Sequence, residues 1–438
     1  MPIAGGRSVD IAAMSDRQAL DHAGHLIDVS FDAQCSPGLD RAFVLLDELQ
    51  LRTLAPDIAA LVHYFRANAW AGREQLRTAP DVWAWEQPEH QEQILALRSA
   101  VRHEGFRQLP ETRRCQILTN LANELNHIGR FVDAVELWDR ALHLDGSFGM
   151  ARGNHGLGLL SYADVLYDRA QAVFMLVSAH DALESASAAD AYYESAGYEP
   201  ALAVFEKRRQ EIASLGDMPA IRRRFNSRHH SLGKSKGEKR YRSWCLRNRL
   251  FINPLNDLGT LPVASHDVLT LPSLTVPMEN ATADPPPIVG FFNQIKQEFA
   301  SARYLYYEGV HAKGLHYSDR GVLLYNTLDY PNYSLATEKI RLAFRASYSL
   351  FDKIGFFIND YFALGIKPDR VSFRSIWYEA RGKPPRPLLQ RFRAYANWPL
   401  RGLFWLSKDL FDDTFKSATE PDAAELNDIR NHLEHKYL

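Results

Sequence analysis

Cysteine is scarce in this sequence, and none of it stands at a metal-binding spacing. The 438 residues contain 3 cysteines, Cys35, Cys115 and Cys245, which lie far apart and form no C-x-x-C motif. Their odd number and wide separation argue against a disulfide framework and against a cysteine-ligated zinc site. The pattern favours a reducing compartment, and we expect a cytoplasmic protein.

Long apolar segments are absent as well. The first residues, MPIAGGRSVDIAAMSDRQ, contain no apolar core of a signal peptide, so we expect no secretion signal. The most apolar stretch, around residues 340–364, is interrupted by the charged side chains of Arg341, Arg345, Asp352, Lys353 and Asp360. Such a segment is too polar to cross a bilayer, and we predict no membrane partner.

The sequence also lacks a large net charge and the common cofactor motifs. A formal net charge of -2 confines any nucleic-acid surface to a local patch. The tripeptide GKS at 233–235 is no phosphate loop, because Arg228 stands where that motif needs its first glycine. His432 and His435 lack further ligands at a suitable spacing, and the H-x-E at 432–434 lacks the P-C-x-x-C half of a zinc deaminase. We therefore predict neither a metal nor another cofactor.

Residues 1–220 contain a succession of helical patterns. The clearest unit has two apolar helical faces around a turn at Gly129: Leu118, Leu121, Ala122 and Leu125, then Ala134, Trp138, Ala141 and Leu142. Its small residues and its single large ring resemble a tetratricopeptide repeat. Gly156 follows Ala122 at the distance of one repeat, where the next small residue is expected. The sequence departs from the repeat at Gly146, where proline is usual. We predict a tetratricopeptide-like array that binds a protein or peptide partner. An array that only packs stays open as the alternative.

The next segment, residues 221–250, is strongly basic. It holds eleven Lys or Arg against one acid, Glu238, with Phe225, Tyr241 and Trp244 interleaved. Cations beside aromatic rings suit an RNA backbone with stackable bases. The candidate RNA-binding residues are Arg222, Arg223, Arg224, Lys239, Arg240 and Arg242. A solvated basic connector is the alternative.

A Pro-rich stretch that ends in the triple proline 285–287 closes this segment, so we predict a basic segment and linker over 221–287. Residues 288–438 then show four helical patterns, at 288–309, 333–364, 398–416 and beyond Thr419. These patterns predict an all-α protein in which a helical-hairpin array precedes a four-helix bundle over 288–438.

The last helical pattern carries the strongest candidate for a catalytic site. Its apolar stripe consists of Leu426, Ile429, Leu433 and Tyr437. Arg430 lies about 60° from Leu433, at the edge of the stripe, whereas Asn431 and His435 share the face nearly opposite to it. Histidine transfers protons near neutral pH, and arginine binds phosphate oxygens. A plain surface pair of Arg430 and Glu434 is the alternative.

The stretch RNHLEH, from Arg430 to His435, resembles the R-x4-6-H motif of the HEPN family (higher eukaryotes and prokaryotes nucleotide-binding). The amino-acid sequence over residues 290–438 also resembles that of toxin-like prokaryotic HEPN proteins. The resemblance implies a metal-independent endoribonuclease, usually a homodimer, that acts in antiviral defence or as a toxin. It also implies that Arg430 and His435 are catalytic and that Asn431 orients the phosphate or the imidazole.

A polar line on the long pattern 333–364 is a further candidate. Glu338, Arg345 and Asp352 recur every seven residues, and they either support the Arg430–His435 pair or form a solvent-facing stripe. For the whole protein two alternatives to the nuclease stay open. One is a catalytically inactive HEPN module that binds RNA or nucleotide, and the other is an interaction scaffold based on the repeats.

Overall fold

The computed structural model describes residues 11, 13–77, 81–194, 197–224, 230–273, 286–325, 332–379, 386–412 and 415. Within these ranges the chain forms fifteen α-helices with short 3-10 turns, and its extended pairing is limited to two isolated bridges. The predicted all-α class is therefore confirmed. The chain gathers into two compact units, Met1–Asn226 with Arg393–Pro421, and Ser227–Phe392 with Asp422–Leu438.

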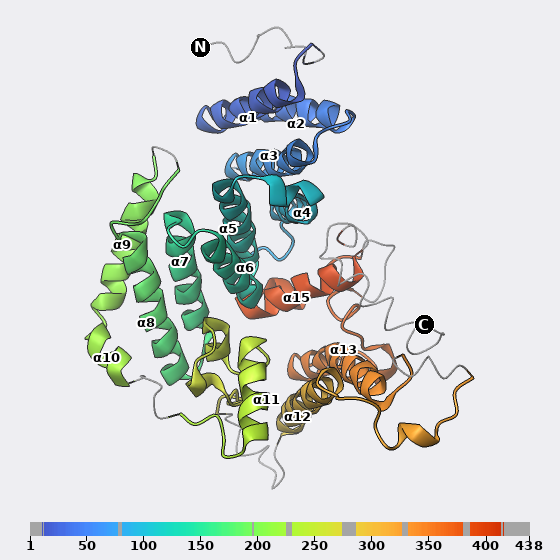
Figure 1. Cartoon of the computed structure of the whole chain (residues 1–438). Helices are drawn as coiled ribbons and strands as arrows, with labels where there is room; N and C mark the ends of the chain where they lie inside the picture. Colours follow the sequence, from blue (N-terminus) through green and yellow to red (C-terminus); the bar gives the residue numbers. More distant parts are fainter. Residues whose placement is uncertain are drawn as a thin grey trace. The chain divides into compact units, whose positions relative to one another are not determined.

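The first unit is an array of helical hairpins, which Figure 1 shows following one another in chain order. Its helices are α1 (Asp16–Asp32), α2 (Ser36–Gln50), α3 (Pro56–Gln75), α4 (Pro88–Arg102), α5 (Glu111–His127), α6 (Phe131–Leu144), α7 (Gly149–Val165), α8 (Arg169–Ala186), α9 (Glu199–Ala213) and α10 (Met218–Arg224). From α1 to α8 each odd-numbered helix packs against the next, and neighbouring hairpins then pack against each other.

The hairpin of α5 and α6 shows why this sequence folds as an array. Its fully buried small side chains are Ala122, Ala134 and Ala141. They admit close contact between helices around Trp138, which is 1% exposed. Gly129 turns the chain with a φ of 92°, which favours glycine. Gly156 of α7 packs against α8, because a Cβ there would lie 2.6 Å from Leu183 Cγ. The predicted helix–turn–helix is present, whereas its tetratricopeptide relationship stays a prediction.

The helix predicted over 398–416 is α15 (Trp398–Phe411), and it packs within the first unit. This placement differs from its predicted role as the third helix of a C-terminal bundle. The close packing of α15 against the turn between α5 and α6 requires two glycines, since a Cβ on Gly402 would lie less than 3.0 Å from the carbonyl oxygen of Gly129. Apolar periodicity predicts a buried face but does not identify the surface that covers it.

The second unit contains two long antiparallel helices, which Figure 1 shows side by side. Its described helices are α11 (Lys236–Arg247), α12 (Pro287–Val310), α13 (Leu335–Tyr361) and the short α14 (Gln390–Arg393), whose last residue belongs to the first unit. Ion pairs of Glu298 with Lys353 and of Glu308 with Lys339, the latter at 2.9 Å, link α12 to α13. The helix predicted beyond Thr419 lies outside the described residues.

The predicted domain boundaries at 220 and 287 stay predictions. Each compact unit combines two segments that are separated along the chain. None of the helices that the structure describes is long and apolar enough to cross a membrane.

Candidate functional site

The predicted catalytic residues Arg430, Asn431 and His435 lie within 416–438, outside the described residues. Their mutual geometry stays a prediction, and so does the homodimer in which two copies of the motif would face each other. The residues predicted to support them, and those predicted to bind RNA, can mostly be placed.

The three supporting residues lie along α13, and the contacts of Glu338 and Asp352 can be described. Glu338 forms an ion pair with Arg341 at 2.7 Å. Asp352 accepts a hydrogen bond from the backbone N–H of Phe373 at 3.1 Å. Arg345 is half-buried on the same helix. The Asp352 contact holds the segment that follows α13, and a catalytic role for the three residues stays a prediction.

Three of the six predicted RNA-binding residues, Arg222, Arg223 and Arg224, lie on α10 in the first unit. Arg222 forms an ion pair with Asp181 of α8, so its charge is already engaged. Arg223 is exposed to solvent, and the side chain of Arg224 lies outside the described part of the chain.

The other three, Lys239, Arg240 and Arg242, lie on α11 in the second unit. Arg242 forms an ion pair with Glu238 at 2.9 Å and contacts His266 Nε2 at 2.6 Å. Lys239 and Arg240 are exposed, and neither has an ion-pair partner among the residues that the structure describes. These two charges are therefore better placed than Arg242 to meet a ligand.

The aromatic side chains of α11 pack against tyrosines of α12. The ring centroids of Tyr241 and Tyr307 are 5.0 Å apart, and those of Trp244 and Tyr306 are 5.7 Å apart. Tyr304 is 47% exposed and Tyr306 is 41% exposed. Sequence reasoning noticed the rings between the basic residues but missed these tyrosines, for which the run YLYY was the available signal. The surface beside the α11 cations thus carries partly exposed aromatic rings.

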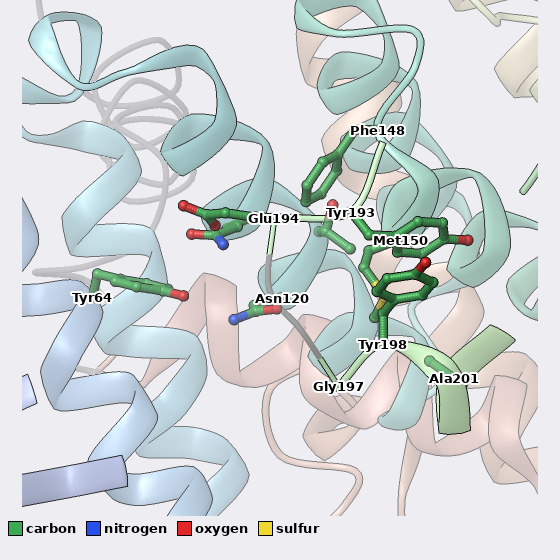
Figure 2. Close-up of a pocket in the computed structure, with 11 residues that line it drawn as sticks. Tyr64, Asn120, Phe148, Met150, Tyr193, Glu194, Gly197, Tyr198 and Ala201 are labelled. Carbon is green, nitrogen blue, oxygen red and sulfur yellow. The ribbon is translucent and has the colours of Figure 1, made fainter. Parts of the chain in front are cut away.

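A pocket of about 240 Å³ opens among the helices of the first unit (Figure 2). In Figure 2, Tyr64 of α3 lies on one side, Tyr198 lies on the other, and Asn120 of α5 lies between them. Thr119 also lines the pocket and is 2% exposed. Its hydroxyl oxygen and Gln116 Oε1 have no hydrogen-bond partner among the described residues. Because buried polar groups are normally paired, these atoms mark a candidate ligand site.

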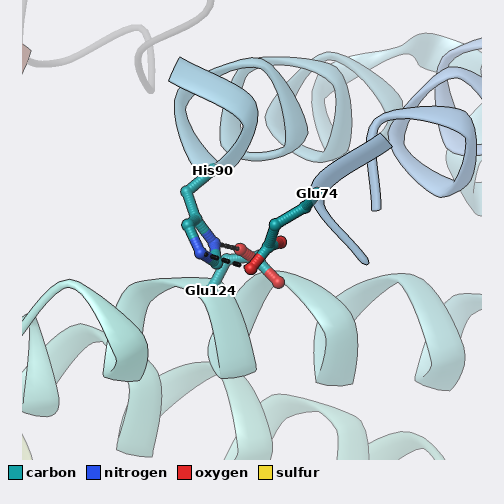
Figure 3. Close-up of side chains that lie close together, drawn as sticks. All are labelled: Glu74, His90 and Glu124. Atoms are coloured by element: carbon teal, nitrogen blue, oxygen red, sulfur yellow. Dashed lines mark hydrogen bonds and ion pairs between the residues drawn. The ribbon is translucent and has the colours of Figure 1, made fainter. Parts of the chain in front are cut away.

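A charged cluster joins α3, α4 and α5. The Nε2 atom of His90 lies 2.7 Å from Glu74 Oε1, and its Nδ1 atom lies 2.5 Å from Glu124 Oε2 (Figure 3). The ring of His127 stacks on that of His90 with 4.0 Å between centroids. His127 Nε2 in turn lies 2.9 Å from Gln87 Oε1 and donates to it. The cluster ties three helices of the array together.

The two stacked histidines have opposite pKa shifts. Burial alone would lower the pKa of His90, but its hydrogen bonds with Glu124 and Glu74 outweigh burial and raise the pKa to about 9. Burial, together with the positive charges of His90 and Arg401, lowers the pKa of His127 to about 4. At neutral pH a charged ring therefore stacks on a neutral one, which avoids repulsion between them.

We expect His90 to make the stability of the protein pH-dependent on the alkaline side. Its folded-state pKa, about 9, lies above the unfolded value, so the stabilisation is complete below about pH 6.5 and is lost as pH rises through 9. The loss in the free energy of unfolding is on the order of 3 kcal/mol, since each pKa unit corresponds to about 1.4 kcal/mol. Urea denaturation across this pH window measures it. The His90→Gln protein should lack the alkaline loss, the exposed-site control His143→Gln should keep it, and parallel losses in all three proteins would contradict the assignment.

The donor atoms of Glu74, His90 and Glu124 lie within 4.8 Å of one another, which is close enough to consider a metal ion. However, each ring nitrogen of His90 contacts a different carboxylate, an arrangement that fits a bridging imidazolium better than converging metal ligands. A second group of this kind on α8 includes Asp181, which is paired with Arg222. Sequence reasoning missed the first cluster because its members are widely separated along the chain.

Buried charges anchor α15 within the first unit. Asp409 accepts hydrogen bonds from Arg98 at 2.6 and 2.9 Å and from Arg130 at 2.5 Å. Burial would raise the pKa of the Asp409 carboxyl, but the two arginines outweigh burial and lower it. The carboxylate is therefore charged at neutral pH and links α15 to α4 and to the turn before α6.

Backbone carbonyl groups of the array complete this attachment. Arg401 is 1% exposed and donates to the carbonyl oxygen of Val82 at 2.8 Å and to that of His127. The indole N–H of Trp405 donates to the carbonyl oxygen of Trp85 at 3.0 Å. Because carbonyl oxygens at helix ends and in loops need donors, these side chains of α15 help to satisfy the backbone of the array.

Comparison with known proteins gives one result, and it concerns the C-terminal part of the chain. No curated protein and no solved structure matches the sequence. Residues 280–438, which include α12, α13, α15 and the predicted catalytic trio, match the family described as LA2681-like HEPN.

Proposed function

We propose that this protein is a metal-independent endoribonuclease, in which the HEPN region cuts RNA and the helical array senses a partner. The observation that carries the proposal is the HEPN match over 280–438, because it covers Arg430, Asn431 and His435. A role in antiviral defence or as a toxin, and action as a homodimer, belong to the same proposal and rest on the family resemblance.

The proposed chemistry uses the 2′-hydroxyl of RNA as the nucleophile. His435 removes the proton from this hydroxyl or donates one to the leaving 5′-oxygen. Arg430 stays charged and stabilises the phosphorane oxygens, and Asn431 orients the phosphate or the imidazole. The products are a 2′,3′-cyclic phosphate and a 5′-hydroxyl, so cleavage in EDTA with analysis of the RNA ends tests the mechanism.

The geometry of α11 supports RNA as the substrate. At 100° per residue, the four exposed cations of this helix fall within an arc of about 100°. They are Lys236, Lys239, Arg240 and Arg247. Trp244 flanks this arc and contacts Tyr306, which is partly exposed. A row of cations beside exposed rings suits single-stranded RNA, whose backbone is charged and whose bases stack.

Removing two of these cations should weaken RNA binding in a salt-dependent way. For the Lys239→Ala/Arg240→Ala protein, the slope of log affinity against log salt concentration should fall by about 1.4, since each single-strand phosphate contact contributes about 0.7. Fluorescence polarisation with a short single-stranded RNA measures the slope. An equally charged control, Arg17→Ala/Arg208→Ala, removes exposed arginines of the first unit and should leave the slope unchanged. An unchanged slope in both proteins would rule out this surface.

A further inference from the structure

The pocket of the first unit has a chemical character that points to its ligand. Its lining holds oxygen acceptors, amide groups and aromatic rings, and Glu194 is the charged side chain among them. No lysine or arginine lines it within the described residues, so an anionic ligand would find no cationic side chain in the lining. A purely apolar ligand would leave the buried oxygens of Thr119 and Gln116 unsatisfied.

The acceptors are arranged on one face of α5. Gln116, Thr119 and Asn120 stand at positions i, i+3 and i+4, so their side chains lie next to one another along the helix. The Thr119 hydroxyl is buried, whereas Gln116 is half-buried and reaches the same pocket. Thr119 Oγ1 and Gln116 Oε1 can each accept a hydrogen bond and have no partner among the described residues, which favours a ligand that brings several N–H groups.

Aromatic rings supply flat surfaces beside these acceptors. Tyr193 and Tyr198 stack on each other with 4.4 Å between centroids and 14° between planes, and Tyr193 Oη donates to the carbonyl of Ala186 at 2.7 Å. Across the pocket, the guanidinium of Arg113 lies 5.0 Å from the ring centroid of Tyr64. The unit thus already holds one arginine over one of its tyrosines, and the rings near Glu194 remain for a ligand.

We propose that this pocket binds a guanidinium group. A guanidinium is planar, carries five N–H donors and stacks on aromatic rings, so it matches the acceptors, the tyrosines and the acid together. The pocket volume of about 240 Å³ is several times the roughly 30 Å³ that one water takes up in the liquid, so the pocket is large enough for an arginine-sized group. The inference rests on the sensing role proposed for the array, and it names the chemistry that the array recognises.

Calorimetric titration of the full-length protein tests this inference without any measurement of RNA cleavage. The probes are the peptide Gly-Arg-Gly, the same peptide with neutral citrulline in place of arginine, and agmatine. We expect Gly-Arg-Gly to bind at least about tenfold more tightly than the citrulline peptide, since a charge-assisted hydrogen bond is about twice as strong as a neutral one. If agmatine binds as tightly as the peptide, the ligand is a free guanidinium compound. If only the peptide binds, the ligand is an arginine of a protein partner.

Two variants connect the binding to the acceptors. Thr119→Val removes the buried oxygen and should weaken Gly-Arg-Gly binding several-fold, whereas Gln116→Glu adds a charge and should strengthen it by about tenfold. The exposed-site control Thr53→Val should bind like wild type. Because Gln116 is half-buried, its variant remains informative if Thr119→Val fails to fold. Equal binding of the arginine and citrulline peptides, or no binding of any probe, would overturn the proposal and leave the nuclease proposal untouched.

Discussion

Replacing His435 with alanine is expected to stop RNA cleavage while RNA binding is kept. The imidazole is the only proposed group that exchanges a proton near neutral pH, and loss of such a group costs about 10²–10⁴-fold in rate. Initial rates of cleavage of an end-labelled RNA in EDTA measure the loss. Analysis of the new ends then shows whether wild type leaves 2′,3′-cyclic phosphates.

The neighbouring residues provide matched controls. His432→Ala removes a histidine of the same stretch and should cut like wild type. Arg430→Lys keeps one charge but loses the bidentate contact, so it should be slower than wild type and faster than Arg430→Ala. Cleavage by His435→Ala at the wild-type rate would refute its catalytic role. RNA binding without cleavage by any of the proteins, and without toxicity on expression, would favour the inactive HEPN module.

Replacing Asp409 with alanine is expected to destabilise the first unit strongly. Asp409 is 5% exposed and compensates the guanidinium groups of Arg98 and Arg130. Removing it leaves both positive charges in a buried site, which typically costs about 3–5 kcal/mol in the free energy of unfolding. Urea denaturation followed by circular dichroism measures this free energy.

The control for this change removes another partner of the same arginine. Asp133 pairs with Arg130 at 2.8 Å, but its side chain is 43% exposed. Asp133→Ala should therefore cost less than about 1 kcal/mol, as exposed ion pairs do. If the two variants were equally stable, the buried network would not be what holds α15 to the array.

Much of the fold could be predicted because its signals are local. The faces of α5 and α6 and the turn at Gly129 all lie within about 30 residues, where helical periodicity is informative. The docking of α15 could not be predicted in this way, because Asp409 and Arg98 are separated by 311 residues. An apolar stripe fits many partner surfaces, and the close approach of two glycines and the buried Asp409–Arg98 pair make this one specific.

The candidate sites also differ in whether their signals are local in the sequence or depend on distant residues. The excess of positive charge at 221–250 is a property of composition and could be predicted, whereas the contact of Arg242 with His266, 24 residues away, depends on the fold. The Glu74–His90–Glu124 cluster and the guanidinium pocket each gather residues from several helices. No short motif marks such sites, since their geometry exists only after the helices have packed.

The position of α15 has a consequence for how this protein can be divided. The first compact unit is discontinuous, and residues 227–392 are inserted between its two segments. A fragment cut at the start of the HEPN match would carry Trp405 and Asp409 without the surface that buries them. Excised HEPN fragments should therefore aggregate, and transplanting this region into another protein would require transferring its receiving surface as well.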